Sequence, residues 1–400
     1  MPKKCRKNNA ENSVLPCRGV IDFIPNWPSL LPPCTVHISS IRSSQTITYF
    51  LLLQRPEWQP IPVMVGLLGC SVPSVLKSEI LKALSSLSKS PEIALDVWNA
   101  LEASNFIAVS SGVVPSNATS GVAAIVPGRL QKGGFLLELE TVETQAEEYP
   151  MTLAFLTLMD TLMDHYSFIL GSNSGNPTAI AAFNTFSRLL VDDIFLNFYN
   201  KSYKNLVEKW QIAEACLKII NRFVSDDTLL GGLVVGSIEA SAPRVDTGSR
   251  ILTHLNQPSE LLRLMLHILD EGCSAVESYI KFPGKTNVEK SCLQVLQILR
   301  RVLELQPQLM KAARESTSDT GFLTGLDKLL LGVNPRTGKA DYILTLAKFI
   351  ASFTALPSHT VEAINLLNVI SSPANQVSLL GQLNVTDAAA KIIIKGTCEI

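Results

Sequence analysis

The sequence is poor in charged and in aromatic side chains. Charged residues make up 17% of its 400 residues and aromatic residues 6%, whereas hydrophobic residues make up 46%. The 34 lysines and arginines nearly balance the 35 aspartates and glutamates, which leaves a net charge of −1. Because no strong overall field surrounds such a chain, direct binding of nucleic acid or anionic lipid is not expected. The balance favours proteins as partners.

Long hydrophobic runs are also absent. The most apolar stretches are residues 48–53, 61–70 and 229–238. Each provides at most about half of the ~20 apolar residues that a membrane-spanning helix needs. The first residues are basic and then polar, without the apolar segment of a secretory signal. We therefore predict no transmembrane segment and a soluble protein with an apolar interior.

Paired metal-binding and redox motifs are missing. The eight cysteines lie at positions 5, 17, 34, 70, 216, 273, 292 and 398, and no two of them form a CxxC pair. This spacing excludes a recognisable zinc knuckle or dithiol motif. Scattered cysteines in a chain of this length are typical of a reduced, intracellular protein.

Catalytic patterns are absent as well, and the nearest imitations fail on spacing. Residues 332–339 resemble a phosphate-binding loop, but one residue too many separates the glycines and Ala340 follows the lysine. Adjacent residues on a helix do not face each other, so Glu147 and Glu148 do not form a general acid–base pair. The five histidines show no paired spacing. We predict no catalytic, cofactor-binding or metal-binding residues, no cofactor and no enzymatic activity; an enzyme with an unrecognised helical fold is the remaining alternative.

What the sequence does contain is helical periodicity. Apolar residues recur every three or four positions from residue 74 to 87, and again after Pro91, Pro150 and Pro177. Proline favours the first turn of a helix, so these three prolines are predicted helix starts. Further helices are predicted over 203–224, 258–281, 286–303, 319–331, 340–355, 359–371, 373–382 and 385–395. No strand-like alternation occurs after residue 135, and the predicted fold class is all-α.

The predicted architecture is an irregular α-helical solenoid of stacked antiparallel helix pairs. The helices follow one another in pairs and carry apolar residues on more than one face, so each needs neighbours on two sides. A large globular helical domain is the alternative. Residues 1–60 are rich in proline and are predicted to form an irregular lead. The solenoid is predicted over 61–400, with long loops near 103–135 and 225–250.

Several segments, taken in order, resemble one protein family. They are residues 70–77, 89–94 with Trp98, 137–140, 147–155, 208–214, 282–290 and 334–341. None of them is a catalytic motif, but the ordered set resembles the large inner-ring scaffold nucleoporins of the nuclear pore, the nucleoporin two-hundred-five group. The resemblance covers about residues 66–400. It departs from the family pattern at Leu153, in the loop 225–250 and throughout residues 1–60.

The resemblance implies a structural role in the inner ring of the nuclear pore complex, at the nuclear envelope. Its implied partners are other inner-ring and linker nucleoporins, with no small-molecule substrate and no direct nucleic acid. Family members are several times longer, so the chain is expected to be an interior fragment of a solenoid, with apolar faces at both ends and poor solubility. The alternative is a HEAT-type transport receptor or adaptor, which would show more regular repeats of ~40 residues.

Overall fold

The computed structural model describes residues 59–104, 106–107, 134–172, 177–227, 229–230, 247–277, 282–315, 323–333, 335–336, 338–352 and 355–371. Every regular element within these ranges is a helix, which confirms the all-α prediction. None of these helices combines the length and the apolar character needed to cross a membrane. Nearly all of the predicted lead 1–60, most of both predicted loops, and the predicted helices 373–382 and 385–395 lie outside the described residues.

The described elements follow one another in short connections. In the first half they are α3 (Pro60–Leu68), α4 (Ser74–Leu87), α5 (Pro91–Ala103), α6 (Gly134–Glu138), η3 (Leu139–Glu143), α7 (Thr144–Ala146), α8 (Pro150–Met163), α9 (Tyr166–Ser172), α10 (Pro177–Arg188) and η4 (Leu189–Phe195). In the second half they are η5 (Phe198–Asn200), α11 (Leu206–Ser225), α12 (Thr247–Leu255), α13 (Glu260–Glu277), α14 (Lys285–Glu315), α15 (Leu326–Leu330), α16 (Asp341–Ala351) and α17 (Pro357–Ile370).

The predicted helix starts agree with the structure where proline marks them. Helices α5, α8 and α10 begin at Pro91, Pro150 and Pro177, because proline has no amide proton to leave unpaired in the first turn. The helix predicted over 319–331 is wrong in extent, since α15 begins only at Leu326. Gly325 precedes it with φ +94°, a left-handed backbone conformation that ends any helix running into it.

Two helical segments contain π-helical turns, and the first was not predicted. Residues 134–146 form α6, η3 and α7 in succession, and η3 is a π-helix. The second π-helix, η4, continues α10. A π-helical turn breaks the 3.6-residue period on which the sequence analysis relied, so η3 gives no regular helical pattern.

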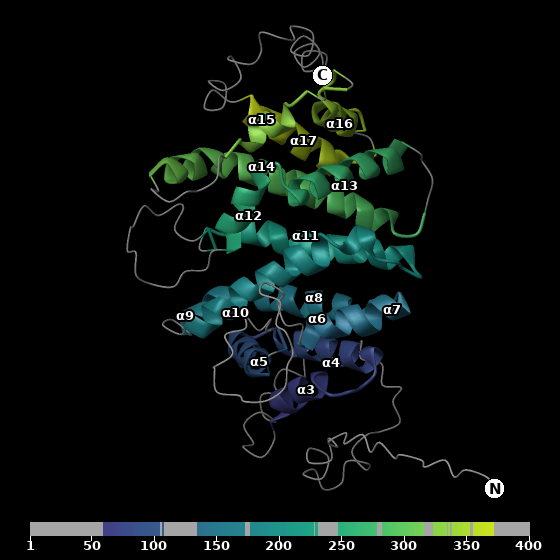
Figure 1. Cartoon of the computed structure of the whole chain (residues 1–400), viewed down its shortest axis with the longest axis vertical. Helices are drawn as coiled ribbons and strands as arrows, with labels where there is room; N and C mark the ends of the chain where they lie inside the picture. Colours follow the sequence, from purple (N-terminus) through teal and green to yellow (C-terminus); the bar gives the residue numbers. More distant parts are fainter. Residues whose placement is uncertain are drawn as a thin grey trace, which may run out of the picture.

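The helices stack into two rows. In the first row α4, α8, α11, α14 and α17 pack on one another in that order, and we call these five helices the spine. Figure 1 shows the spine helices as successive steps along the long axis of the molecule. The second row includes α5 against α9, α12 against α13, and α13 against α16. This arrangement is the predicted α-helical solenoid.

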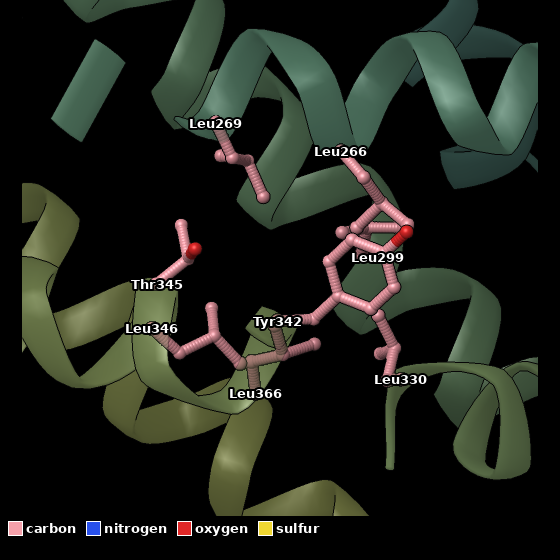
Figure 2. Close-up of a pocket in the computed structure, with 8 residues that line it drawn as sticks. All are labelled: Leu266, Leu269, Leu299, Leu330, Tyr342, Thr345, Leu346 and Leu366. Carbon is pink, nitrogen blue, oxygen red and sulfur yellow. The ribbon is translucent and has the colours of Figure 1, made fainter. Parts of the chain in front are cut away.

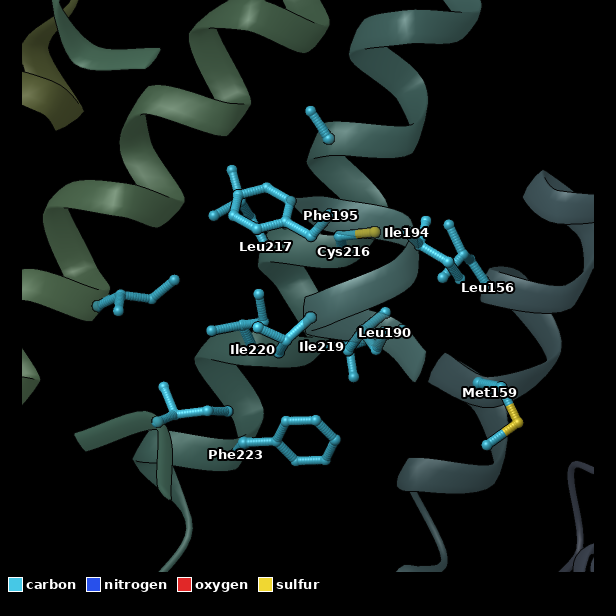
Figure 3. Close-up of a cluster of buried hydrophobic side chains, with 14 of the residues drawn as sticks. Leu156, Met159, Leu190, Ile194, Phe195, Cys216, Leu217, Ile219, Ile220 and Phe223 are labelled. Carbon is cyan, nitrogen blue, oxygen red and sulfur yellow. The ribbon is translucent and has the colours of Figure 1, made fainter. Parts of the chain in front are cut away.

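The core is continuous along the stack because the middle helix α11 is buried on several sides. Its buried side chains are Trp210, Ile212, Ala213, Cys216, Leu217, Ile219, Ile220, Phe223 and Val224. Figure 3 shows part of this cluster, in which α11 residues meet Leu156 and Met159 of α8 and Leu190, Ile194 and Phe195 of η4. Met159 and Met163 are 0% and 4% exposed, as expected for methionines that fill the core.

Candidate functional site

The most densely interlocked polar region lies at the starts of the spine helices. Contacts between α8 and α11 advance together along both chains, from Tyr149 with Glu208 to Asp164 with Arg222. Contacts between α11 and α14 advance in the same way, so the three helices run parallel. Their first turns therefore lie on one side of the stack, which we call the spine edge. Three of the family-like segments, 147–155, 208–214 and 282–290, lie at this edge.

The start of α8 is held by a glutamate from another helix. The carboxylate of Glu143, at the end of η3, accepts hydrogen bonds from the amides of Met151 at 2.6 Å and Thr152 at 3.2 Å. It also accepts one from the Thr152 hydroxyl at 2.5 Å. A negative charge at this point satisfies free amides and opposes the positive end of the helix dipole. Glu143 thus performs the role that the sequence analysis assigned to no residue.

Glu143 was missed because its capping role depends on tertiary structure. An ordinary N-cap side chain lies next to the helix that it caps, whereas Glu143 lies seven residues before Pro150 and on a separate helix. The π-helix η3 ends at Glu143, which is 0% exposed. Five glutamates between residues 138 and 148 were visible in the sequence, but their spacing does not distinguish the buried one.

Burial shifts the pKa values of the charged groups at this site. Desolvation raises the pKa of Glu143 to about 7, although the Thr152 hydroxyl and the two amides favour its ionised form. Desolvation lowers the pKa of Lys201 to about 8, against the attraction of Glu143 and Glu140. The lysine ammonium lies 5.4 Å from the centre of the Tyr149 ring. The two opposite charges hold each other in a partly dry environment, which is a structural use of ionisable groups.

Tyr149 and the segment after it connect α8 to the approach of α11. The Tyr149 hydroxyl donates to the carbonyl of Ser202 at 3.1 Å, and its amide donates to Glu208 at 3.1 Å. Lys204 returns two contacts, from its amide to the Glu147 carbonyl at 3.0 Å and from its ammonium to Glu148 at 3.1 Å. Glu147 and Glu148 therefore belong to an interlayer contact.

An aromatic cluster continues the edge toward α13. The Lys209 ammonium lies 3.9 Å above the ring centre of Tyr199, and the Tyr199 hydroxyl donates to Glu271. His267 lies with its Nδ1 atom 3.3 Å from the same hydroxyl. Cation–π contacts of this kind stabilise partly exposed aromatic rings. Every group in the cluster is engaged by another, which leaves no poised nucleophile or base.

The start of α14 completes the edge. Gly284 has φ +91°, and its Cα region approaches the backbone of Val207 so closely that an added Cβ would lie 3.4 Å from the Val207 Cα. One turn later Asn287 donates to Glu214 of α11 at 2.5 Å, and Lys290 pairs with the same carboxylate at 3.1 Å. Glycine is the residue suited to this backbone conformation and close approach.

The motifs rejected in the sequence analysis do not converge on this edge. The stretch 332–339 connects α15 to α16, as predicted for a turn, although residues 334 and 337 lie outside the described part. His359 is buried, with its Nε2 atom 2.6 Å from the Glu289 carbonyl, and His165 and His254 lie in other layers; His37 lies outside the described residues. Among the described residues no group of His, Cys, Asp or Glu is arranged to hold a metal ion.

The pockets of the described part are small and apolar. One lies between α13, α14, α15, α16 and α17 and is lined by Leu266, Leu269, Leu299, Leu330, Tyr342, Thr345, Leu346 and Leu366. Figure 2 shows these side chains pointing toward one another. The other lies around Trp98 and Phe183, and each has about 230 Å³ of empty space. Sites for small molecules usually measure roughly 300–1,000 Å³ and carry convergent polar groups.

Comparisons with known proteins agree with one another. A family model described as a nuclear pore complex scaffold, nucleoporins 186/192/205, matches residues 37–393. Nuclear pore complex protein Nup205 of Homo sapiens is 32% identical over 354 residues, which are 87% of this chain and 17% of the human protein. The Drosophila melanogaster protein of the same name is 29% identical, over 84% of this chain and 15% of its own length. The Arabidopsis thaliana NUP205 is 23% identical, over 85% of this chain and 17% of that protein. The chain thus spans less than a fifth of the length of these relatives.

Proposed function

The chain belongs to the family of nuclear pore complex scaffold nucleoporins 186/192/205, and on this premise we propose that it is a scaffold segment of the inner ring of the nuclear pore complex. In this role it supports pore assembly and nucleocytoplasmic transport by holding other nucleoporins in place. The proposed location is the nuclear envelope. The proposed partners are inner-ring and linker nucleoporins.

The observation that supports the proposal best is the unbroken packing of the spine. Each helix from α4 to α17 rests on the next through apolar contacts, and ion pairs such as Lys218 with Asp160 and Arg300 with Glu362 join the layers. Such a stack transmits load and presents long surfaces. Together with the small apolar pockets, it favours a mechanical protein without a substrate, and we propose no enzymatic activity.

The irregular spacing of the layers favours this family over a HEAT-type transport receptor. Residues that bond across successive spine helices are 58 positions apart between α8 and α11, 73 between α11 and α14, and 62 between α14 and α17. HEAT repeats recur at roughly 40–47 residues. The longer and unequal steps of this chain, with inserted elements such as η4 and η5, differ from that pattern.

The proposal is tested by expressing the tagged 400-residue chain in cells, imaging it, and identifying captured proteins by mass spectrometry. A signal at the nuclear rim together with inner-ring nucleoporins is expected. The matched control is Leu217→Asp, which places a charge at a core position that is 0% exposed and should abolish both signals. A folded wild-type chain that is diffuse in the cytosol and captures no nucleoporin would contradict the proposal.

A further inference from the structure

Four exposed apolar side chains lie over the first turn of α4 and the helical segment α6–η3. They are Val75, Leu76, Leu137 and Val142, with exposed fractions of 62%, 47%, 46% and 39%, and we call them the α4/α6 patch. Monomeric soluble proteins scatter single apolar side chains over their surfaces, but adjacent ones gathered on two elements mark interaction sites.

An ion pair brings the two halves of the patch together. The ammonium of Lys77 lies 2.6 Å from the carboxylate of Glu138, and their side chains are 1% and 23% exposed. Lys77 directly follows Leu76 and Glu138 directly follows Leu137, so this contact joins the two exposed pairs. Figure 1 shows α4 and α6 next to each other at the same level of the stack.

The patch is not needed for the internal packing of either element. The buried side of α4 includes Ile80, Leu81 and Leu84, and α4 packs against α8. The buried side of α6 consists of Phe135 and Leu136. Val75, Leu76, Leu137 and Val142 point away from these buried sides, since all four are exposed.

The surroundings of the patch are acidic. Residues 133–187 contain no lysine or arginine, whereas Glu138, Glu140, Glu147 and Glu148 follow Leu137 within eleven positions. Glu79 lies on α4, one turn after Val75, and pairs with Lys82. An acidic surface repels anionic lipid and nucleic acid, and it attracts basic protein segments.

We propose that the α4/α6 patch docks a basic amphipathic helix of a partner protein. Apolar side chains of that helix would cover Leu76 and Leu137, and its lysines or arginines would face the glutamates of α6, η3 and α7. This is the helix-in-groove mode of recognition, in which apolar anchors give affinity and flanking charges give orientation. The inference rests on the proposed role of the chain as a docking scaffold, and it adds the chemical class of one partner.

The test uses the full chain and two synthetic helical peptides of equal length. Both carry leucine on one face; the other face is lysine in one peptide and glutamate in the second. Fluorescence anisotropy should show saturable binding of the lysine peptide that weakens with salt, and at least tenfold weaker binding of the glutamate peptide. The double variant Leu76→Ser/Leu137→Ser keeps the charge of the chain and should bind the lysine peptide at least tenfold more weakly.

The matched control is Leu344→Ser/Val361→Ser, which removes two apolar side chains of similar exposure, 50% and 55%, from α16 and α17. It should bind the lysine peptide as the unaltered chain does, and both variants should keep the unaltered melting temperature because the replaced side chains are exposed. Equal weakening in both double variants, or equal binding of both peptides, would overturn the inference.

Two further outcomes separate this inference from the scaffold proposal. Self-association of the unaltered chain in sedimentation, lost in Leu76→Ser/Leu137→Ser, would assign the patch to a second copy of the chain and overturn the inference. If the chain reaches the nuclear rim with inner-ring partners but binds no lysine peptide, the docking inference fails and the scaffold proposal stands.

Discussion

At the scale of single residues, the tightest contact in the stack is between Gly272 of α13 and Cys292 of α14. A Cβ added at Gly272 would lie 2.1 Å from the Cys292 sulfur, which is far inside van der Waals contact. Both residues are buried, so neither helix has room to yield. The glycine therefore sets the distance at which the two helices cross.

Gly272→Ala is expected to destabilise the chain by roughly 1–3 kcal/mol, as overpacking of a filled core does. The lower melting temperature should be measured by circular dichroism. Gly66→Ala in α3 is the matched control, because nothing lies within 4 Å of an added Cβ there and alanine favours a helix. Adding Cys292→Ala to Gly272→Ala should restore part of the loss; no restoration would show that the clash lies elsewhere.

Glu143 should give the chain a distinctive dependence on pH. Its pKa is raised from 4.5 to about 7 in the folded chain, so between these values the folded chain holds a proton that the unfolded chain releases. Its contribution is therefore fully present below pH 4.5 and is lost as the pH rises toward 7. The free energy of unfolding of the unaltered chain should fall over this range relative to that of Glu143→Gln.

Urea titrations at several pH values between 4.5 and 7 measure this difference. The glutamine variant keeps the shape of the side chain but does not titrate, so it serves as the control for all other ionisable groups. Parallel pH profiles of the two proteins would contradict the assigned shift. A difference that grows in the opposite direction would mean that the hydrogen bonds to Met151 and Thr152 outweigh burial.

At the scale of elements, the spine helices are connected through their first turns. The hydroxyl of Tyr149, next to α8, reaches the carbonyl of Ser202, four residues before α11 begins. Tyr149 is 0% exposed, so its hydroxyl has no access to water when this bond is lost. The connection between these two helices thus depends on a buried polar contact as well as on apolar packing.

Tyr149→Phe is expected to cost about 1–2 kcal/mol, because it leaves a buried carbonyl unsatisfied. Hydrogen exchange should accelerate in the amides of residues 198–206. Tyr342→Phe is the matched control, since the Tyr342 hydroxyl makes no hydrogen bond within the described residues. Faster exchange in α16 alone, with none near residue 202, would contradict this prediction.

At the scale of the whole molecule, each layer touches only its neighbours along the spine. A stack of this kind behaves as a nearly one-dimensional chain of units, and a local defect loosens the adjoining layers first. Phe223 of α11 lies in the middle of the stack, with ring centres 5.9 Å from Phe183 and 6.2 Å from Phe186. It is therefore suited to testing how far a defect spreads.

Phe223→Ala is expected to cost roughly 3–5 kcal/mol through the cavity that it leaves. Hydrogen exchange should rise in α8, α10, α11 and α12 and stay nearly unchanged in α17. Val361→Ala, a truncation at an exposed position of α17, should have little effect anywhere. A uniform rise over all helices after Phe223→Ala would show that the chain unfolds as one cooperative unit, unlike a solenoid.

The sequence by itself determined the helices and the class of the fold. Periodic apolar residues with prolines in first turns predicted the starts of α5, α8 and α10, because these signals depend on neighbours within one helical turn. The wide apolar surface of α11 likewise required packing on more than one side, which a stack supplies. The absence of paired ligands and catalytic spacings could also be read directly from residue order.

Only the tertiary structure decided which side chains meet between layers. Glu143 caps α8 from another helix, Gly272 faces Cys292, and Gln306 and Asn256 hold the start of α15 from distant positions. The length of η3 and η4 was also hidden, since π-helical turns depart from the period used to predict helices. Interlayer contacts join residues many tens of positions apart, and local periodicity contains no information about such pairs.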